Sequence, residues 1–167
     1  MGLFYHNSRL KAGFVVNEES QKEQFNSNQI QNTQEEKEEN TKELDWYLEI
    51  PAIELKAEIC EGTTKEVMDK FIGHFEETSK DKGNVGLAAH NRGYENNYFA
   101  KLKELKEGDK IIYQYQNTKR EYIITKHVII KDTDWTNLED TKENTITLIT
   151  CVENEPEYRR CIQGVEE

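Results

Sequence analysis

The feature that most constrains the fold is a series of short apolar segments that recur from Trp46 to the C terminus. In the segment from Ile53 to Ile59, apolar residues alternate with glutamate and lysine. A period of two is that of a strand with one buried face. Turn signals such as Gly83-Asn84 separate the segments. The pattern predicts a mainly β fold, with seven or eight short strands arranged as a barrel and only a few short helices.

The predicted strands cover residues 46–50, 53–59, 85–89, 110–116, 121–130, 145–150 and 158–164. One helix is expected after Thr63, because Thr63 and Glu66 fit a capping box and apolar residues follow at helical spacing as far as Phe75. A helical turn or two is expected between Phe99 and Leu105. The long polar stretch 132–143 is expected to be a loop.

An apolar run that begins at Ile146 ends abruptly at a threonine-cysteine pair, of which Cys151 is the second residue. A cysteine at the end of a buried strand has a rigid backbone, while its sulfur is free to face a cleft. Arg159 and Arg160 follow after a polar, acidic loop. A guanidinium group near the sulfur would stabilise a thiolate, or an oxyanion that forms beside it. Cys151 is therefore the candidate nucleophile.

A cysteine nucleophile needs a base, and His90 has the best local context among the four histidines. It follows the small apolar run from Val85 to Ala89, at the end of a predicted strand, and precedes Asn91. His74 and His127 have no partner signal and are interpreted as structural or surface residues. Cys60 and Cys161 lie on apolar strand faces and are interpreted as small hydrophobic residues.

The Thr-Leu-Ile-Thr-Cys motif that ends at Cys151, the upstream Ala-Ala-His-Asn stretch around His90 and the downstream arginine resemble the sortase family of bacterial cysteine transpeptidases. The order of the three elements matches the family pattern. The resemblance covers roughly residues 44–165, which is nearly all of the predicted folded domain at 44–167. It implies a closed eight-stranded β-barrel, which agrees with the strand count above.

The resemblance also implies an activity. Cys151 would attack the carbonyl of a threonine in a sorting motif similar to Leu-Pro-x-Thr-Gly and form a thioacyl-enzyme. His90 would protonate the leaving amine, and Arg159 would hold the substrate and stabilise the oxyanion. An amine of a cell-wall precursor would then resolve the acyl-enzyme. Thr150 and Ala88 match positions that line the substrate groove in the family.

Arg159 is preferred over Arg160 because it matches the spacing of the family's arginine to a downstream small residue, here Gly164. Side chains of adjacent strand residues point to opposite faces, so only one of the two arginines can face the cysteine. Arg160 is expected to be solvated.

Two features of the sequence bear on the subclass. The stretch 131–145 has no room for a long inserted helix, which disfavours the subgroup that carries one. Asp45-Trp46 lacks the proline of an Asp-Pro-aromatic lid, so no lid is expected. A housekeeping-type or a sporulation-associated, class D-like sortase remains, and the second is the preferred interpretation.

No organic cofactor is required for this chemistry. Zinc is disfavoured because the three cysteines form no paired ligand spacing. Some sortases bind calcium through loop carboxylates, and six acidic residues here offer hard oxygen ligands: Glu54, Glu58, Asp132, Asp134, Glu139 and Asp140. A solvated acidic face is the preferred interpretation.

Two other classes of function stay open at this stage. One is a hydrolytic cysteine peptidase with the same three residues. The other is a non-catalytic barrel that binds cell-wall peptide, in which Cys151 is inert.

Residues 1–43 are predicted to form a flexible or disordered extension, because their Glu-, Gln- and Asn-rich middle part has too few aliphatic residues to form a core. No run of the sequence approaches the eighteen apolar residues of a membrane span, so the membrane anchor that sortases usually carry is not expected within these residues. The net charge of −11 disfavours nucleic acid as a partner. By resemblance, the partners are surface proteins with a C-terminal sorting motif, and the location is the outer face of the bacterial membrane or the cell wall.

Overall fold

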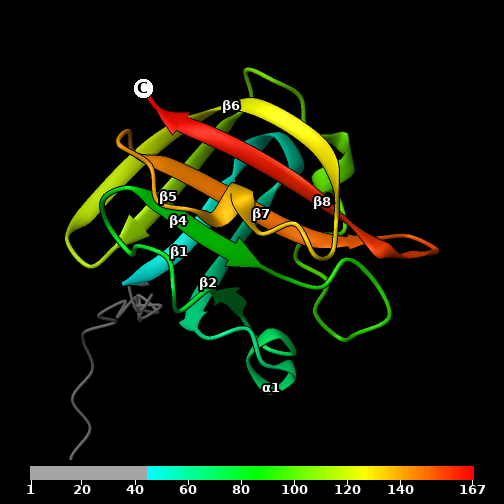
Figure 1. Ribbon diagram of the computed structural model, residues 1–167. Helices are drawn as coiled ribbons and strands as arrows, with labels where there is room; N and C mark the ends of the chain where they lie inside the picture. The colour runs from blue at the N-terminus through cyan, green and yellow to red at the C-terminus, as the bar shows by residue number, and fades with distance from the viewer. Residues whose placement is uncertain (1–44) are drawn as a thin grey trace, which may run out of the picture. The chain divides into compact units, whose positions relative to one another are not determined.

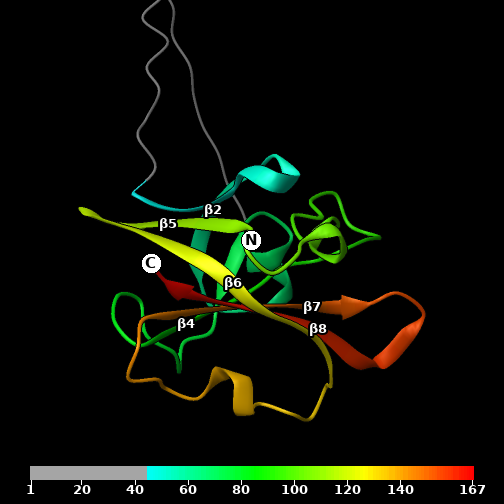
Figure 2. The same ribbon diagram turned by 90° about the horizontal axis from the view of Figure 1, so that it is seen from above.

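The computed structural model describes residues 45–167, in which eight strands form a closed barrel (Figure 1 and Figure 2). Around the barrel the strands follow the order β1-β2-β3-β4-β7-β8-β6-β5. The strands are β1 (Trp46–Ile50), β2 (Leu55–Glu61), β3 (Ile72–His74), β4 (Asn84–Ala88), β5 (Lys110–Tyr115), β6 (Thr118–Lys131), β7 (Thr145–Val152) and β8 (Glu155–Glu166). The mainly β barrel predicted from the sequence is confirmed. The predicted N-terminal extension lies outside the described residues.

The helical elements are single turns that connect strands. They are η1 (Pro51–Ile53), α1 (Lys65–Met68), η2 (Leu102–Glu104) and η3 (Thr136–Leu138). Two neighbouring strand pairs are parallel, β2 with β3 and β4 with β7, and the other neighbours are antiparallel. A parallel pair needs a crossover connection, and α1 lies in the crossover from β2 to β3.

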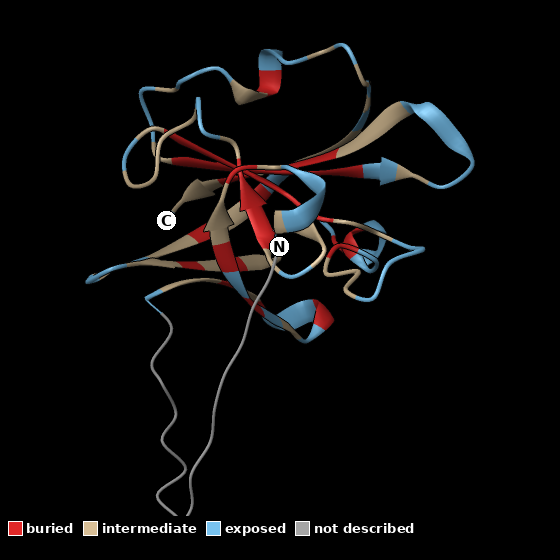
Figure 3. Ribbon diagram, turned by 90° about the horizontal axis from the view of Figure 1, so that it is seen from below, coloured by how far each residue is buried: buried red, intermediate tan, exposed pale blue. Residues whose placement is uncertain are grey.

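The strands β4 and β7 are buried over most of their length (Figure 3). Every residue of β4 is buried, and so are the first six residues of β7. Alternate residues of β7, Ile146 and Leu148, belong to the hydrophobic core together with Ile162 of β8. Even-numbered residues of β7 and β8 therefore point into the barrel, and odd-numbered residues point outward.

The predicted helix from Thr63 to Phe75 is wrong beyond its first turn. The capping hydrogen bond is accepted by Thr64, not Thr63, and the helix ends at Met68. Ile72 instead belongs to β3 and pairs with Ile59 of β2. Apolar residues at helical spacing form a strand here because pairing with β2 buries Ile72 completely. The local pattern could not reveal this non-local partner.

The loop between β6 and β7 crosses the outer face of the sheet in front of β4 and β7 (Figure 1). Its backbone is fastened there, because the Asn137 carbonyl accepts hydrogen bonds from side chains of three strands: Asn84 of β4, Thr147 of β7 and Gln163 of β8. A Cβ atom at Gly86 would lie only 2.7 Å from Leu138, so the glycine permits this close approach. The loop thus covers the first half of the outer face of β4. These contacts do not extend to the C-terminal end of β4.

Acid sensitivity of the barrel is expected from Glu166, whose carboxylate accepts hydrogen bonds from Asn144 and Arg120. These two contacts lower the pKa of the carboxyl group below its usual 4.5. A lowered carboxyl pKa contributes stability above the unfolded pKa, and that stability is lost as the pH falls through the folded pKa. We expect Glu166→Gln to lower the melting temperature near neutral pH but to reduce its further decline below about pH 4.5. Glu155→Gln is the control, and an unchanged acid slope in Glu166→Gln would contradict the expectation.

Candidate active site

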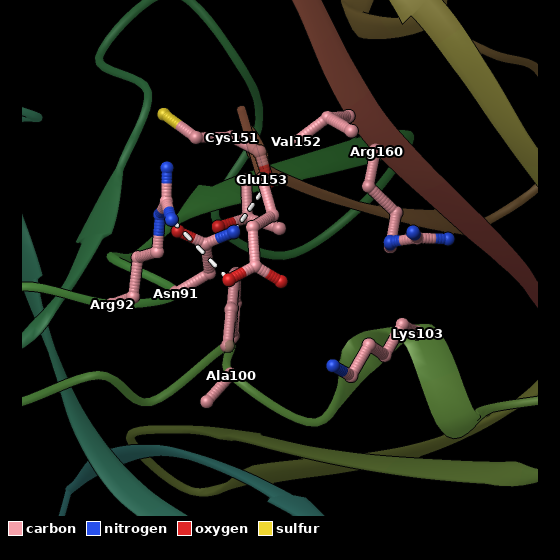
Figure 4. Close-up of a pocket in the computed structure, with 10 residues that line it drawn as sticks. Asn91, Arg92, Ala100, Lys103, Cys151, Val152, Glu153 and Arg160 are labelled. Carbon is pink, nitrogen blue, oxygen red and sulfur yellow. Dashed lines mark hydrogen bonds and ion pairs between the residues drawn. The ribbon is translucent and has the colours of Figure 1, made fainter. Parts of the chain in front are cut away.

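Cys151 lies near the end of β7 and is exposed. Its odd position on β7 directs the side chain to the outer face, because the flanking even positions point into the barrel. Figure 4 shows the sulfur pointing away from Arg160, although both residues line the same pocket. The thiol is thus open to an incoming group on the outer face.

Arg159 of β8 is the residue directly opposite Cys151 in the antiparallel pairing of β7 with β8. Directly opposite residues project to the same side of a sheet, so Arg159 shares the outer face with the cysteine. Its Nη1 donates hydrogen bonds to the carbonyls of Pro156 and Tyr158, at 2.7 and 2.8 Å. Its Nη2 lies 4.0 Å from a carboxylate oxygen of Asp132. The guanidinium group is thereby kept beside the β7–β8 turn.

Arg160 is half-buried rather than solvated, in contrast to the expectation from the sequence. It pairs with Thr150, on the inward side of the sheet, and its Nη1 lies 2.5 Å from Nε2 of His127. Together with Lys103 of η2 it lines a polar cavity of about 180 Å³ at the end of the barrel (Figure 4). The side chains of Arg159 and Arg160 therefore lie on opposite faces of the sheet, as strand alternation predicts.

His90 follows β4 directly, and the residues on either side of it are tied to β7. The carbonyl of Ala89 accepts a hydrogen bond of 2.7 Å from Thr150 Oγ1. The side-chain amide of Asn91 donates one of 2.7 Å to the carbonyl of Cys151. These two hydrogen bonds hold the backbone of His90 next to that of Cys151. The sequence did not indicate this contact of Asn91, although the residue directly follows His90.

Ala88 and Thr150, the two residues assigned to the substrate groove by resemblance, lie on different faces. Ala88 pairs with Ile149, so it shares the outer face with Cys151. Thr150 points inward, is buried and bonds Ala89. Ile149 is the residue that strand alternation from Cys151 would have added to the outer face. Leu138 and Thr78, the side chains that pack against Gly86, also line a mainly apolar hollow of about 470 Å³, together with Thr63, Phe75, Glu77, Trp135 and Glu139.

The other cysteines and histidines have structural surroundings. Cys161 is fully buried, and burial raises the pKa of its thiol to about 11, while Cys60 is half-buried. His74 is fully buried, with its Nδ1 2.9 Å from a carboxylate oxygen of Glu61. Nε2 of His127 lies beside the guanidinium group of Arg160, and its Nδ1 lies 2.9 Å from the carbonyl oxygen of Leu105.

The acidic residues considered as calcium ligands are spread over several elements. Asp134 accepts hydrogen bonds from Thr136, and Asp140 accepts them from Asn84 and Thr141. Within residues 45–167, no three His, Cys, Asp or Glu side chains are grouped so as to hold a metal ion. That the reaction needs no metal or cofactor stays a prediction.

A family model described as the sortase domain matches residues 48–166. The chain belongs to the sortase family. Sortase A of Bacillus anthracis is 32% identical over 117 residues, which cover 69% of this chain and 55% of that protein. Sortase D of Bacillus subtilis is 32% identical over 108 residues, which cover 62% of this chain and 52% of that protein. The chain thus spans about half the length of these curated relatives.

Solved sortase structures share the fold. Sortase C1 from Streptococcus agalactiae has a TM-score of 0.68 and 26% identity, covering 73% of this chain and 66% of that one. A pilus-related sortase C of Group B Streptococcus has a TM-score of 0.70 and 26% identity, covering 75% and 68%. The similar proteins carry the names sortase A, C and D, so the class D-like assignment stays a prediction. None of the helices in residues 45–167 has the length and apolar character needed to cross a membrane.

Proposed function

We propose that this sortase is a cysteine transpeptidase that cleaves a sorting motif similar to Leu-Pro-x-Thr-Gly after threonine. The observation that carries the proposal is the convergence of three groups at one end of the barrel. Cys151 and Arg159 are directly opposed on the outer face, and the backbone of His90 is clamped to the same end of β7. Family membership supports this use of the three residues.

The first half-reaction forms a thioester. The sulfur of Cys151 attacks the threonine carbonyl, and the negative charge that develops on the oxygen is stabilised by the guanidinium of Arg159. As the C–N bond breaks, the imidazolium of His90 gives its proton to the leaving amine. In the second half-reaction an incoming amine attacks the thioester carbonyl, neutral His90 takes the amine's proton, and the Cys151 thiolate leaves.

The substrate groove in this proposal follows the outer face of β4 and β7. Ala88 and Ile149 form its floor next to Cys151, and both are small or apolar and nearly buried. The hollow lined by Thr78, Leu138 and Trp135 would add an apolar surface next to this groove, since Thr78 and Leu138 pack against Gly86 of β4 and Trp135 is 57% exposed. An apolar residue and a proline of an extended peptide would be suited to such a surface. The partners would be surface proteins that carry the motif and a cell-wall amine, at the outer membrane face or the cell wall.

The test uses the full chain, a Leu-Pro-x-Thr-Gly peptide library and mass spectrometry of the products with and without added amines. Cleavage between threonine and glycine, with the amine joined to the threonine, is the expected result. Hydrolysis that added amines do not divert would identify a peptidase instead. Absence of any cleavage across the library and amines would contradict the proposal and favour a non-catalytic peptide-binding barrel.

A further inference from the structure

The side chain of His90 is surrounded by a small cluster that the sequence did not reveal. Its ring stacks on the ring of Tyr94, with centroids 3.5 Å apart and an interplanar angle of 7°. Its Nε2 lies 3.5 Å from Oδ1 of Asp69, and the His90 side chain is only 12% exposed. The ring is thus held on its face by one residue and at one nitrogen by another.

Asp69 is brought to this position by α1, of which it is the C-cap. Its backbone N–H bonds the carbonyl of Lys65, and its Oδ2 accepts a hydrogen bond from the Lys65 ammonium group at 2.5 Å. Oδ1 remains free of that contact and faces His90. The Lys65 hydrogen bond and, to a smaller extent, His90 lower the pKa of the Asp69 carboxyl group.

The two facing atoms are each short of a partner. Oδ1 of Asp69 and Nε2 of His90 are both buried atoms without a hydrogen bond in the described part of the chain. A buried polar atom without a hydrogen-bond partner destabilises the folded state. The cost is removed when one of the two atoms carries a proton and donates it to the other. With the carboxylate ionised, the proton belongs on Nε2. A slight closure of the 3.5 Å gap then forms a charge-assisted hydrogen bond.

We propose that Asp69 is a positioning residue for His90, which orients the imidazole through Nε2 and favours its protonated form. This inference rests on the proposed function for its catalytic meaning, but the contact itself does not depend on it. Histidines at catalytic and metal sites are commonly oriented by a carboxylate on the second ring nitrogen. The arrangement here places that carboxylate on the crossover turn that joins β2 to β3.

The proposal assigns the two ring protons. Asp69 holds the proton on Nε2, so Nδ1–H is the group left to protonate the leaving amine. After that transfer His90 is neutral, with Nδ1 as the acceptor for the proton of the incoming amine. Titratable and charged groups come from every element around His90: Lys65, Glu66 and the C-cap Asp69 of α1, Arg92 and Tyr94 of the following loop, Cys151 of β7, Glu153 of the β7–β8 turn and Arg159 of β8.

The experiment follows the histidine ring signals by NMR as a function of pH, in the full chain with Cys151→Ala so that no turnover is involved. A His90→Asn spectrum assigns the His90 signal among the four histidines. In Asp69→Asn, which removes the charge with little change of shape, the midpoint of the His90 titration is expected to fall by about 0.5 to 1 pH unit. In the enzyme with Cys151 intact, turnover at about pH 8 should then fall three- to tenfold, by the same ratio.

Three further variants separate this role from a general effect. Glu66→Gln removes one charge from the same helical turn and should leave the midpoint unchanged. Lys65→Met removes the competing partner of Asp69 and should leave the midpoint unchanged or raise it. Asp69→Glu keeps the carboxylate and should recover part of the loss.

An Asp69→Asn protein that melts like its parent and titrates at the same midpoint would overturn the inference. If Asp69→Asn does not fold, a lowered midpoint in Lys65→Met would overturn it instead. Failure of the chain to cleave any sorting peptide would affect the proposed function alone, because the NMR measurement needs no substrate.

Discussion

Cys151→Ala is expected to abolish cleavage of a Leu-Pro-x-Thr-type peptide, with at most a few per cent of the activity remaining. The thiolate is the group that bonds the substrate carbonyl in the proposed reaction, and alanine offers no substitute. The fold should survive, because Cys151 is exposed and packs into no core. The measurement is peptide cleavage followed by chromatography, beside a thermal melt that matches the parent protein.

The other two cysteines provide matched controls. Cys60→Ser should retain most of the activity because Cys60 is half-buried on β2, on the far side of β3 from the site. Cys161→Ser places a hydroxyl in a fully buried position and should lower stability more than activity. Iodoacetamide should label Cys151 before Cys161 in the folded chain. Substantial cleavage by Cys151→Ala would refute the assignment of the nucleophile.

Arg159→Ala is expected to lower kcat/KM by about a hundredfold or more, the usual effect of removing an oxyanion-stabilising donor. Arg160→Ala should lower it by less than about tenfold, because Arg160 points to the opposite face of the sheet. Its main effect should be on stability, since His127 would lose its guanidinium contact. Kinetics on a sorting peptide, with a thermal melt for each variant, compare the two.

Equal losses of activity in the two variants, or a larger loss in Arg160→Ala, would mean that the inward arginine serves the reaction. Arg159→Lys adds a second control, because lysine keeps the charge but not the planar pair of donors. We expect it to recover only part of the activity lost in Arg159→Ala.

The sequence by itself determined the class of fold and the identity of the candidate groups. Alternating apolar residues predict strands because a half-buried strand has a period of two, whatever lies opposite it. The ordered motif around His90, Cys151 and an arginine was enough to indicate the family. Strand alternation alone also predicted that Arg159 and Arg160 would face opposite sides.

The tertiary structure alone decided which segments pair and what surrounds each candidate residue. Ile72 lies in a strand because β2 is beside it, which local helical spacing could not indicate. Arg160 is half-buried because its guanidinium group contacts His127, which lies on a different strand. Asp69 reaches His90 because the barrel brings the crossover turn after β2 next to the end of β4. Such contacts join residues far apart in the chain, and their geometry depends on the closure of the whole barrel, so no local pattern encodes them.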